Sequence, residues 1–228
     1  MCFSAGASIA AFSVGAVSLL VMLRRNMHSA ALFYSIIVVM QLAEYFAHNS
    51  LLSGNKAENK WSAAAILLII FLQPVVWSLY AAHYFVKSNS SRTIIYGAVA
   101  LFSLFFGYFY SFLQRRNAFR VDYLKPKCGP GASICRLDWT FLKESTPLSL
   151  VFISFYFFLF LFSNRAALAA NSRLWLMFSA LPLLLVASLG FMVFVDNVRN
   201  TSALVSGFGS IWCISAVLVG PLTLLLGK

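Results

Sequence analysis

The amino-acid sequence predicts an all-α integral membrane protein, a bundle of seven transmembrane helices. Of its 228 residues, 61% are hydrophobic and only 10% are charged, whereas a soluble domain needs roughly 25% charged residues to keep its surface wetted. The apolar residues stand in continuous runs, each close to the roughly 20 residues that a membrane-spanning helix needs. Backbone amides in lipid must be paired within a helix or a closed barrel. Because the runs lack the alternating pattern of barrel strands, we predict that they are helices.

The predicted spans follow one another along nearly the whole chain. At about 1.5 Å per residue each covers the ~30 Å hydrocarbon core, the fifth only barely. Their connections are short and polar, and only residues 114–146 form a long non-membrane loop. We therefore expect residues 1–228 to form a single polytopic membrane domain. The spans are Ser4–Leu23, Ala30–Leu51, Ser62–Val86, Thr93–Leu113, Pro147–Ser163, Leu174–Val195 and Val205–Leu226.

The charge of the chain is strongly positive, with a net value of +11. Its Lys and Arg residues stand in ones and twos between the spans, with no basic stripe interleaved with aromatic residues, so they indicate contact with lipid headgroups and not with nucleic acid. In the short connections, seven basic residues fall on the side of Arg24 and Lys228, and three fall on the side of Lys56. This difference predicts an N-terminus outside and a C-terminus in the cytoplasm.

Small residues recur at helical spacing on the first and the seventh predicted span. Lipid gives no hydrophobic drive between helices, so close approach through small residues holds such bundles together. We expect both stripes to face other helices and not lipid. The stripes are Ser4, Ser8, Ala11, Gly15 and Ser18 on the first span, and Ser206, Ser210, Cys213 and Gly220 on the seventh.

The second span carries an acidic residue well inside it, Glu44. A charged side chain at the bilayer centre costs roughly 2.5–3.5 kcal/mol on insertion scales, so it usually faces the protein interior and has a partner. Gln41, Glu44 and His48 share one helical face, and His48 is the nearest candidate partner. We interpret this face, together with Gln73, as the lining of a polar cavity for a proton, an ion or a solute. The alternative is a buried hydrogen-bond network that fixes the rotation of the helix.

Four residues predicted in the same leaflet could also hold a metal ion: Cys2, Glu44, His48 and Asp196. Their side chains are of types that suit zinc or copper, but they are scattered without a metal-ligand spacing. A free or lipidated Cys2, an interfacial His48 and a helix-capping Asp196 are the plain alternatives. No cofactor is predicted beyond this metal ion.

Three prolines fall inside predicted spans, at Pro74, Pro182 and Pro221. A proline inside a helix removes one N–H and frees the carbonyl four residues earlier. Interrupted helices in transporters place such backbone groups at a midplane binding site, although proline kinks also occur in spans without any transport role. We predict helix kinks at these three positions.

Two cysteines, Cys128 and Cys135, flank a Gly-Pro-Gly turn in the long loop. This spacing makes a disulfide feasible if the loop faces an oxidising compartment.

The sequence lacks the motifs of common enzymes, such as His-Glu-x-x-His, Gly-x-Ser-x-Gly and a glycine-rich phosphate loop. We therefore predict that the protein is not an enzyme.

The opening Met-Cys-Phe-Ser-Ala-Gly-Ala-Ser, the run Met40–Phe46 and the pair Gln73-Pro74 carry a resemblance. Over the first three predicted spans the chain resembles a group of multi-spanning membrane proteins of unknown function that begin Met-Cys-Phe-Ser-Ala and have Gln-x-x-Glu in the second span. The resemblance implies no activity. It implies only that Cys2, Gln41, Glu44 and Gln73 work together.

These observations predict a polytopic membrane protein that passes or senses a small solute or ion, in a proton-linked way, at the polar cavity. The alternative is a non-catalytic structural or accessory subunit of a larger membrane complex. The predicted partners are the lipid bilayer and either other membrane subunits or further copies of the same chain.

Overall fold

The computed structural model describes residues 4–123, 137–170, 220–221 and 224. Within that part of the chain there are five long α-helices, each with a stretch long and apolar enough to cross a membrane. The helical membrane architecture is thereby confirmed for the first five predicted spans. The sixth and seventh lie almost wholly outside the described residues, so the count of seven stays a prediction. The helices are α1 (Ala5–Arg24), α2 (His28–Ser53), α3 (Lys56–Tyr84), α4 (Asn89–Arg115) and α5 (Thr146–Ala170).

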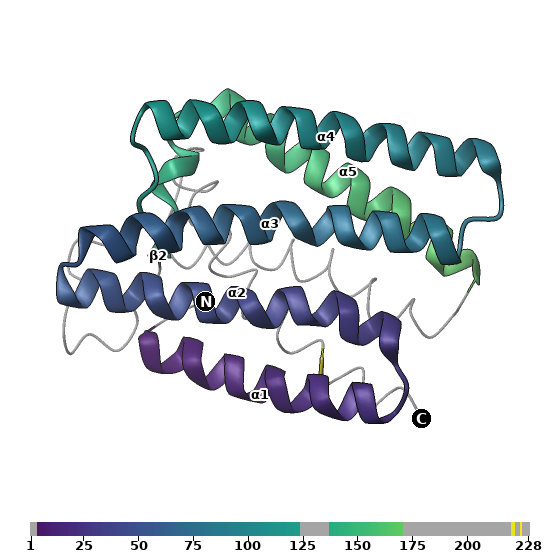
Figure 1. Ribbon diagram of the computed structural model, residues 1–228, viewed down its shortest axis with the longest axis horizontal. Coiled ribbons are helices and arrows are strands. Elements are labelled where there is room, and N and C mark those ends of the chain that lie inside the picture. Colours follow the sequence, from purple (N-terminus) through teal and green to yellow (C-terminus); the bar gives the residue numbers. More distant parts are fainter. Residues whose placement is uncertain (1–3, 124–136, 171–219, 222–223, 225–228) are drawn as a thin grey trace, which may run out of the picture.

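The helices lie side by side, and the chain passes back and forth between two ends of the bundle (Figure 1). α2 packs against α1 and α3, and α5 packs against α3 and α4. We call one end the Gly54 end; it carries the α2–α3 turn at Gly54 and the segment between α4 and α5. The other, which we call the Arg25 end, carries the α1–α2 turn at Arg25 and the α3–α4 turn. Because α3 and α5 both begin at the Gly54 end, they run in the same direction.

Polar residues at the helix ends satisfy backbone N–H groups that a helix cannot pair by itself. The Ser4 Oγ accepts a hydrogen bond from the Ala7 N–H at 3.1 Å, and the Asn55 side chain accepts one from the Glu58 N–H at 3.2 Å. The residue after α2, Gly54, has a φ of 70°, a left-handed conformation that glycine adopts without steric cost. These caps explain why the connections between helices are so short.

The segment between α4 and α5 folds back onto the bundle. It contains two short strands and a single 3-10 turn: β1 (Asp122–Tyr123), β2 (Leu137–Asp138) and η1 (Thr140–Leu142). β1 and β2 pair in an antiparallel ladder, and Val121 and Phe141 are fully buried. The region predicted as a loop is therefore a covering layer over the Gly54 end in its described part.

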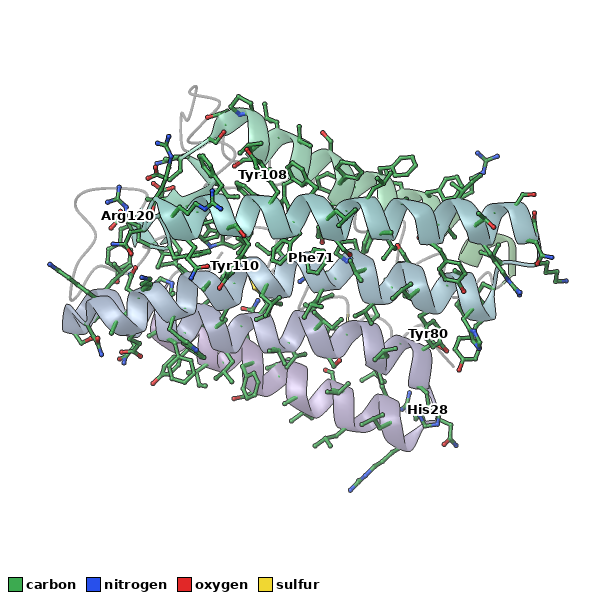
Figure 2. All side chains as sticks on the ribbon, turned by 45° about the horizontal axis from the view of Figure 1, so that its top comes forward. His28, Phe71, Tyr80, Tyr108, Tyr110 and Arg120 are labelled. Carbon is green, nitrogen blue, oxygen red and sulfur yellow. The ribbon has the colours of Figure 1, made fainter. Side chains whose placement is uncertain are left out.

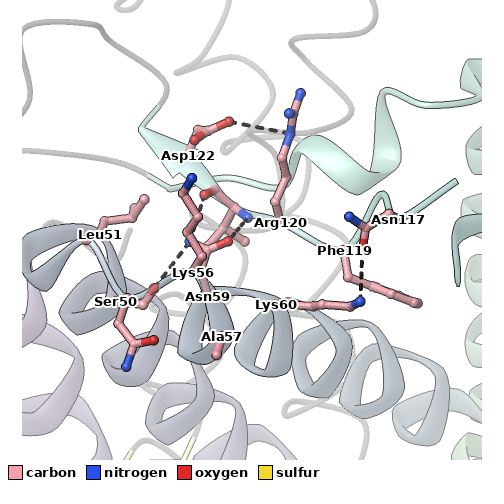
Figure 3. A pocket seen from close by; sticks show the side chains of 13 residues that line it. Ser50, Leu51, Lys56, Ala57, Asn59, Lys60, Asn117, Phe119, Arg120 and Asp122 are labelled. Carbon is pink, nitrogen blue, oxygen red and sulfur yellow. Dashed lines mark hydrogen bonds and ion pairs between the residues drawn. The ribbon is translucent and has the colours of Figure 1, made fainter.

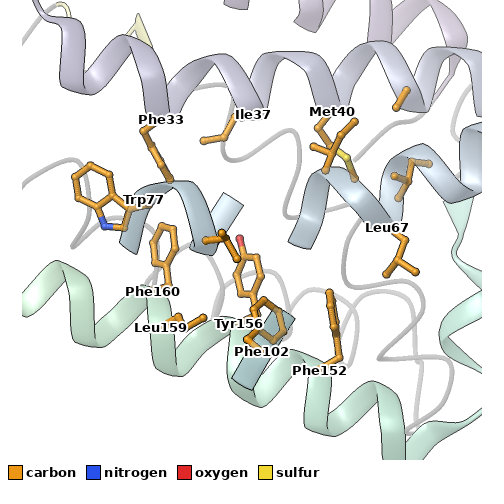
Figure 4. Close-up of a cluster of buried hydrophobic side chains, with 14 of the residues drawn as sticks. Phe33, Ile37, Met40, Leu67, Trp77, Phe102, Phe152, Tyr156, Leu159 and Phe160 are labelled. Atoms are coloured by element: carbon orange, nitrogen blue, oxygen red, sulfur yellow. The ribbon is translucent and has the colours of Figure 1, made fainter. Parts of the chain in front are cut away.

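Aromatic rings from α2, α3 and α5 meet inside the bundle (Figure 4), and serine hydroxyls join α3 to α5. The Phe33 ring meets Trp77 edge-on at 5.4 Å between centroids and Phe160 at 5.5 Å. The Ser163 hydroxyl donates to the Ser78 hydroxyl at 2.8 Å. Interhelical hydrogen bonds of this kind hold helices together in lipid, where apolar contact with a neighbour is no better than contact with an acyl chain.

The small residues of α1 face α2, as the stripe predicts. Ser8, Gly15 and Ser18 are buried, whereas most other α1 side chains are exposed or half-buried. A Cβ atom added at Gly15 would lie 2.7 Å from Cγ2 of Val38 on α2. The absence of a side chain at this position therefore sets how closely the two helices approach.

The C-terminal residues that the structure describes pack against the same helices. A Cβ atom added at Gly220 would lie 2.1 Å from Cζ of Tyr34. The Arg25 guanidinium donates to the Leu224 carbonyl at 3.1 Å. Of the predicted stripe on the seventh span, Gly220 is thus in close contact with α2, and its other members lie outside the described residues.

We predict that Gly15→Ala destabilises the protein by about 1–3 kcal/mol, because the added methyl group overpacks the α1–α2 contact. Gly107→Ala on α4 is the matched control, since nothing lies within 4 Å of a Cβ atom added there. Unfolding of both variants in detergent measures the effect. Equal stability of the two variants would contradict the close approach at Gly15.

Candidate functional site

The polar residues predicted on α2 and α3 are all inside the bundle. Gln41 and Glu44 are 0% exposed, His48 is 1% exposed and Gln73 is 3% exposed. Of the five carboxylate residues in the described part of the chain, Glu44 alone lies within a membrane-spanning helix away from its ends. Its side chain faces protein and not lipid, as the cost of a charge in hydrocarbon requires.

The Gln73 side chain connects α3 to α5. The Tyr156 hydroxyl donates to the Gln73 Oε1 at 2.7 Å, and both residues are buried. Tyr156 was not among the predicted site residues, because it stands in a run of phenylalanines and reads as one more core aromatic. Its hydroxyl group is the one feature that distinguishes it from the neighbouring phenylalanines, since a buried tyrosine needs a hydrogen-bond partner.

The predicted proline positions have different outcomes. α3 continues through Pro74 as one α-helix from Lys56 to Tyr84, and Pro74 is buried beside Gln73. Pro221 and its neighbour Gly220 are helical. Pro182 lies outside the described residues. No kink angle follows from these observations, so the kinks stay predictions.

His48, the member of the α2 stripe nearest the Gly54 end, contacts strand β1. The His48 and Tyr123 rings are 5.8 Å apart between centroids. Tyr123 is half-buried and its neighbour Val121 is fully buried. The segment after α4 therefore covers the end of the polar stripe. The sequence predicts only a loop for this segment.

A single amide side chain fastens this segment to α3. The Asn59 Nδ2 donates to the Val121 carbonyl at 3.0 Å, and the Val121 N–H donates to the Asn59 Oδ1 at 3.0 Å. The same Nδ2 also donates to the Ser50 Oγ at 3.2 Å. Asn59 thus pairs with the Val121 backbone as a strand would, and it joins α2, α3 and the segment at one point.

A pocket of about 660 Å³ opens at the Gly54 end, between the α2–α3 turn and residues 117–122 (Figure 3). Three basic side chains and one acidic side chain line it: Lys56, Lys60, Arg120 and Asp122. Side chains alternate between the two faces of a strand. This alternation puts Asp122 at the pocket while the next residue, Tyr123, contacts His48. Strand β1 therefore contacts both the pocket, through Asp122, and the buried end of the α2 stripe, through Tyr123.

The ion pair and the hydrogen bond at the rim of the pocket are solvent-exposed. Arg120 and Asp122 approach to 3.9 Å with side chains 63% and 55% exposed, a pair of the kind that contributes little to stability. The Lys60 Nζ donates to the Asn117 Oδ1 at 2.8 Å. Figure 2 shows Arg120 at this end of the bundle, projecting away from the helices.

A second ion pair braces the covering layer. The Lys143 Nζ bonds to the Asp138 Oδ2, and Asp138 is only 5% exposed. The Thr140 hydroxyl donates to the Arg120 carbonyl at 2.7 Å. The Lys143–Asp138 pair joins the end of η1 to β2, and the Thr140–Arg120 bond holds η1 to the segment that lines the pocket. No spacing in the sequence predicts either contact.

The proposed metal and disulfide residues are mostly outside the described part of the chain. Cys2, Asp196, Cys128 and Cys135 all belong there, and of the metal set only Glu44 and His48 are described. Within the described residues, no three His, Cys, Asp or Glu side chains converge on a point that could hold a metal ion. Both assignments stay predictions.

Models of known protein families, curated proteins and solved structures were compared with the chain, and none matched. The function is therefore argued from the geometry of these residues alone.

We predict that Asn59→Ala releases residues 117–123 from α3. The variant loses three hydrogen bonds, and we expect a cost of about 1–3 kcal/mol because the Val121 backbone groups are left without partners. Hydrogen exchange at the Val121 amide should become faster, with Asn89→Ala at the Arg25 end as the control. An unchanged exchange rate in Asn59→Ala would count against the Asn59–Val121 pairing.

We predict that the buried packing of Tyr123 is lost at high pH, when its hydroxyl group ionises. Burial raises the pKa of Tyr123 above its ordinary value of 10.0, because desolvation disfavours the tyrosinate. The stability that Tyr123 contributes is therefore complete below pH 10 and is lost as the pH rises through the raised pKa. Subtracting the tyrosinate absorbance of Tyr123→Phe from that of the wild type should give a midpoint above 10.0; a midpoint at or below it would contradict this burial.

Proposed function

We propose that the protein passes or senses a small solute or an ion, linked to a proton, at the buried polar cluster. We define the polar cluster as Gln41, Glu44, His48, Gln73 and Tyr156. The observation that carries the proposal is the position of Glu44, fully buried in the middle of a membrane-spanning helix. Gln41 and His48 are buried on the same helix, and Gln73 and Tyr156 form a buried hydrogen bond between the neighbouring α3 and α5.

The chemistry of the cluster suits a proton-linked ligand. A carboxyl group in a water-poor interior is either neutral or paired with a positive charge, so binding of a cation and binding of a proton at Glu44 compete. Glutamine side chains carry both donors and an acceptor. The Tyr156 O–H already donates to the Gln73 Oε1, so the polar groups of this pair that face a solute are the Gln73 Nε2 donors and the Tyr156 oxygen as an acceptor. A small polar solute could be bound by these neutral groups while Glu44 changes its proton occupancy.

His48 is in the right place to connect the cluster to water. It lies one turn along α2 from Glu44, toward the Gly54 end, and it contacts Tyr123 of strand β1, whose neighbour Asp122 lines the pocket that opens there. We propose that protons reach Glu44 by way of His48. Imidazole is suited to this role, since it exchanges protons near neutral pH.

We also propose the orientation in which the Gly54 end faces outward. Arg24, Arg25, Lys87 and Arg92 lie at the Arg25 end with no carboxylate there among the described residues. At the Gly54 end the basic residues are mixed with Glu58, Asp122, Asp138 and Glu144. The rule counts Lys and Arg beside the short connections, and there the Arg25 end has four (Arg24, Arg25, Lys87 and Arg92) against two at the Gly54 end (Lys56 and Lys60). The side richer in Lys and Arg is typically the cytoplasmic face.

A structural role in a larger membrane assembly is the second candidate. α1 and α4 expose large apolar side chains, among them Val17 at 62% and Leu104 at 74%, and such faces accept a neighbouring helix as readily as lipid. Purification in mild detergent separates the two cases. A stable complex with other membrane proteins, together with an inactive isolated chain, would favour the structural role.

We predict that Glu44→Gln abolishes the pH dependence of transport. The amide keeps the size and polarity of the side chain but cannot bind or release a proton. Proteoliposomes with a trapped pH indicator, tested with a panel of small ions and polar solutes, give the measurement. Glu144→Gln is the control, because it removes a carboxylate outside the bundle interior. Transport by Glu44→Gln equal to the wild type, or none by the wild type with any solute, would exclude the proposal.

A further inference from the structure

The depth of the pocket in the membrane can be read from exposed aromatic residues on α3. Trp61 is 58% exposed near the Gly54 end and Tyr84 is 64% exposed at the Arg25 end. Their separation along the helix corresponds to about 35 Å, close to the ~30 Å hydrocarbon core plus its interfaces. Exposed Trp and Tyr residues gather at the two membrane interfaces. Lys60, which lines the pocket, directly precedes Trp61. The pocket therefore lies at the level of the lipid headgroups.

The charges of the pocket favour an anion. Lys56, Lys60 and Arg120 line it with a single carboxylate, Asp122, so positive charge is in excess. The first turn of α3 also contributes, because Ala57 lines the pocket and the N-terminal amides of a helix carry partial positive charge. Exposed amide groups of Asn55 and Asn117 add neutral hydrogen-bonding capacity.

We propose that this pocket binds a phosphate group, as the headgroup of an anionic phospholipid carries it. Lysine and arginine side chains together with helix N-terminal amides are the groups that recognise phosphate in proteins. A volume of about 660 Å³ lies within the range of small-molecule sites and leaves room for the glycerol part of a headgroup beside the phosphate. The site is distinct from the polar cluster and does not depend on whether Glu44 carries protons.

The position of the pocket favours a lipid over a soluble phosphate as the source. A phospholipid in the surrounding leaflet holds its phosphate at this depth already, and its acyl chains can lie along the exposed apolar faces of the bundle. A soluble phosphate ester carries the same chemistry, so the experiment must separate the two sources. A zwitterionic lipid is expected to bind more weakly, because its ammonium group meets the basic side chains.

Native mass spectrometry of the full-length chain in detergent tests the proposal. Phosphatidic acid, phosphatidylcholine and inorganic phosphate are titrated separately. We expect one phosphatidic acid to stay bound at concentrations at which phosphatidylcholine does not. The variant with Lys56→Gln, Lys60→Gln and Arg120→Gln should lower this affinity by about tenfold or more, since it removes all three charge-assisted contacts. Displacement of phosphatidic acid by inorganic phosphate at a comparable concentration would identify a soluble source, and displacement only at a much higher concentration would identify the lipid.

A charge-matched variant separates a built site from general attraction. Arg24→Gln, Lys87→Gln and Arg165→Gln remove the same charge at the other end of the bundle and should leave phosphatidic acid binding unchanged. Asp122→Asn, which removes the one pocket carboxylate, should increase the affinity, so the proposal stays testable even if the triple pocket variant folds poorly. Equal losses in the two triple variants, unchanged binding in the pocket variant, or no preference of the wild type for phosphatidic acid would overturn it.

Discussion

The cost of placing a polar group in hydrocarbon determines how this bundle is arranged. Glu44, Gln41 and His48 share one face of α2, so only one rotation of that helix hides all three from lipid. α2 has the position that such a helix needs, because α1 and α3 flank it on two sides. The outer helices α1 and α4 carry no such residue in their centres, and they present apolar side chains to the membrane instead.

A second constraint follows from the solvent. Lipid does not drive apolar surfaces together, so the helices are held by close approach and by hydrogen bonds. Gly15 brings α1 onto α2 through the absence of a side chain. Between α3 and α5, by contrast, three buried hydrogen bonds lie along one interface. They join Tyr156 to Gln73, Ser163 to Ser78, and Ser78 to the Leu159 carbonyl. Close backbone approach thus holds α1 to α2, and buried hydrogen bonds hold α5 to α3.

Membrane spans and buried polar residues could be predicted because each depends on composition along one helix. The first five spans, the inward face of Glu44 and the contact of Gly15 all follow from spacing and transfer cost. Tyr156, Asn59 and the pocket could not be predicted, because they depend on which helices become neighbours. The Asn59–Val121 pairing joins residues from two distant parts of the chain, and no local pattern marks an asparagine that binds a backbone. The burial of Val121 and Phe141 was missed for the same reason.

The connection between α4 and α5 is far longer than is needed to join two neighbouring helices. Two neighbouring antiparallel helices can be joined by roughly 2–8 residues, and the chain uses residues 116–145 instead. Each doubling of loop length adds roughly 0.6 kcal/mol of closure entropy, so the extra length opposes folding only mildly. The described part of this connection covers the Gly54 end of the bundle, and the Asn59–Val121 pairing ties it to the helices below. Changes in this connection therefore act on the Gly54 end of the bundle, while the Arg25 end keeps its short turns.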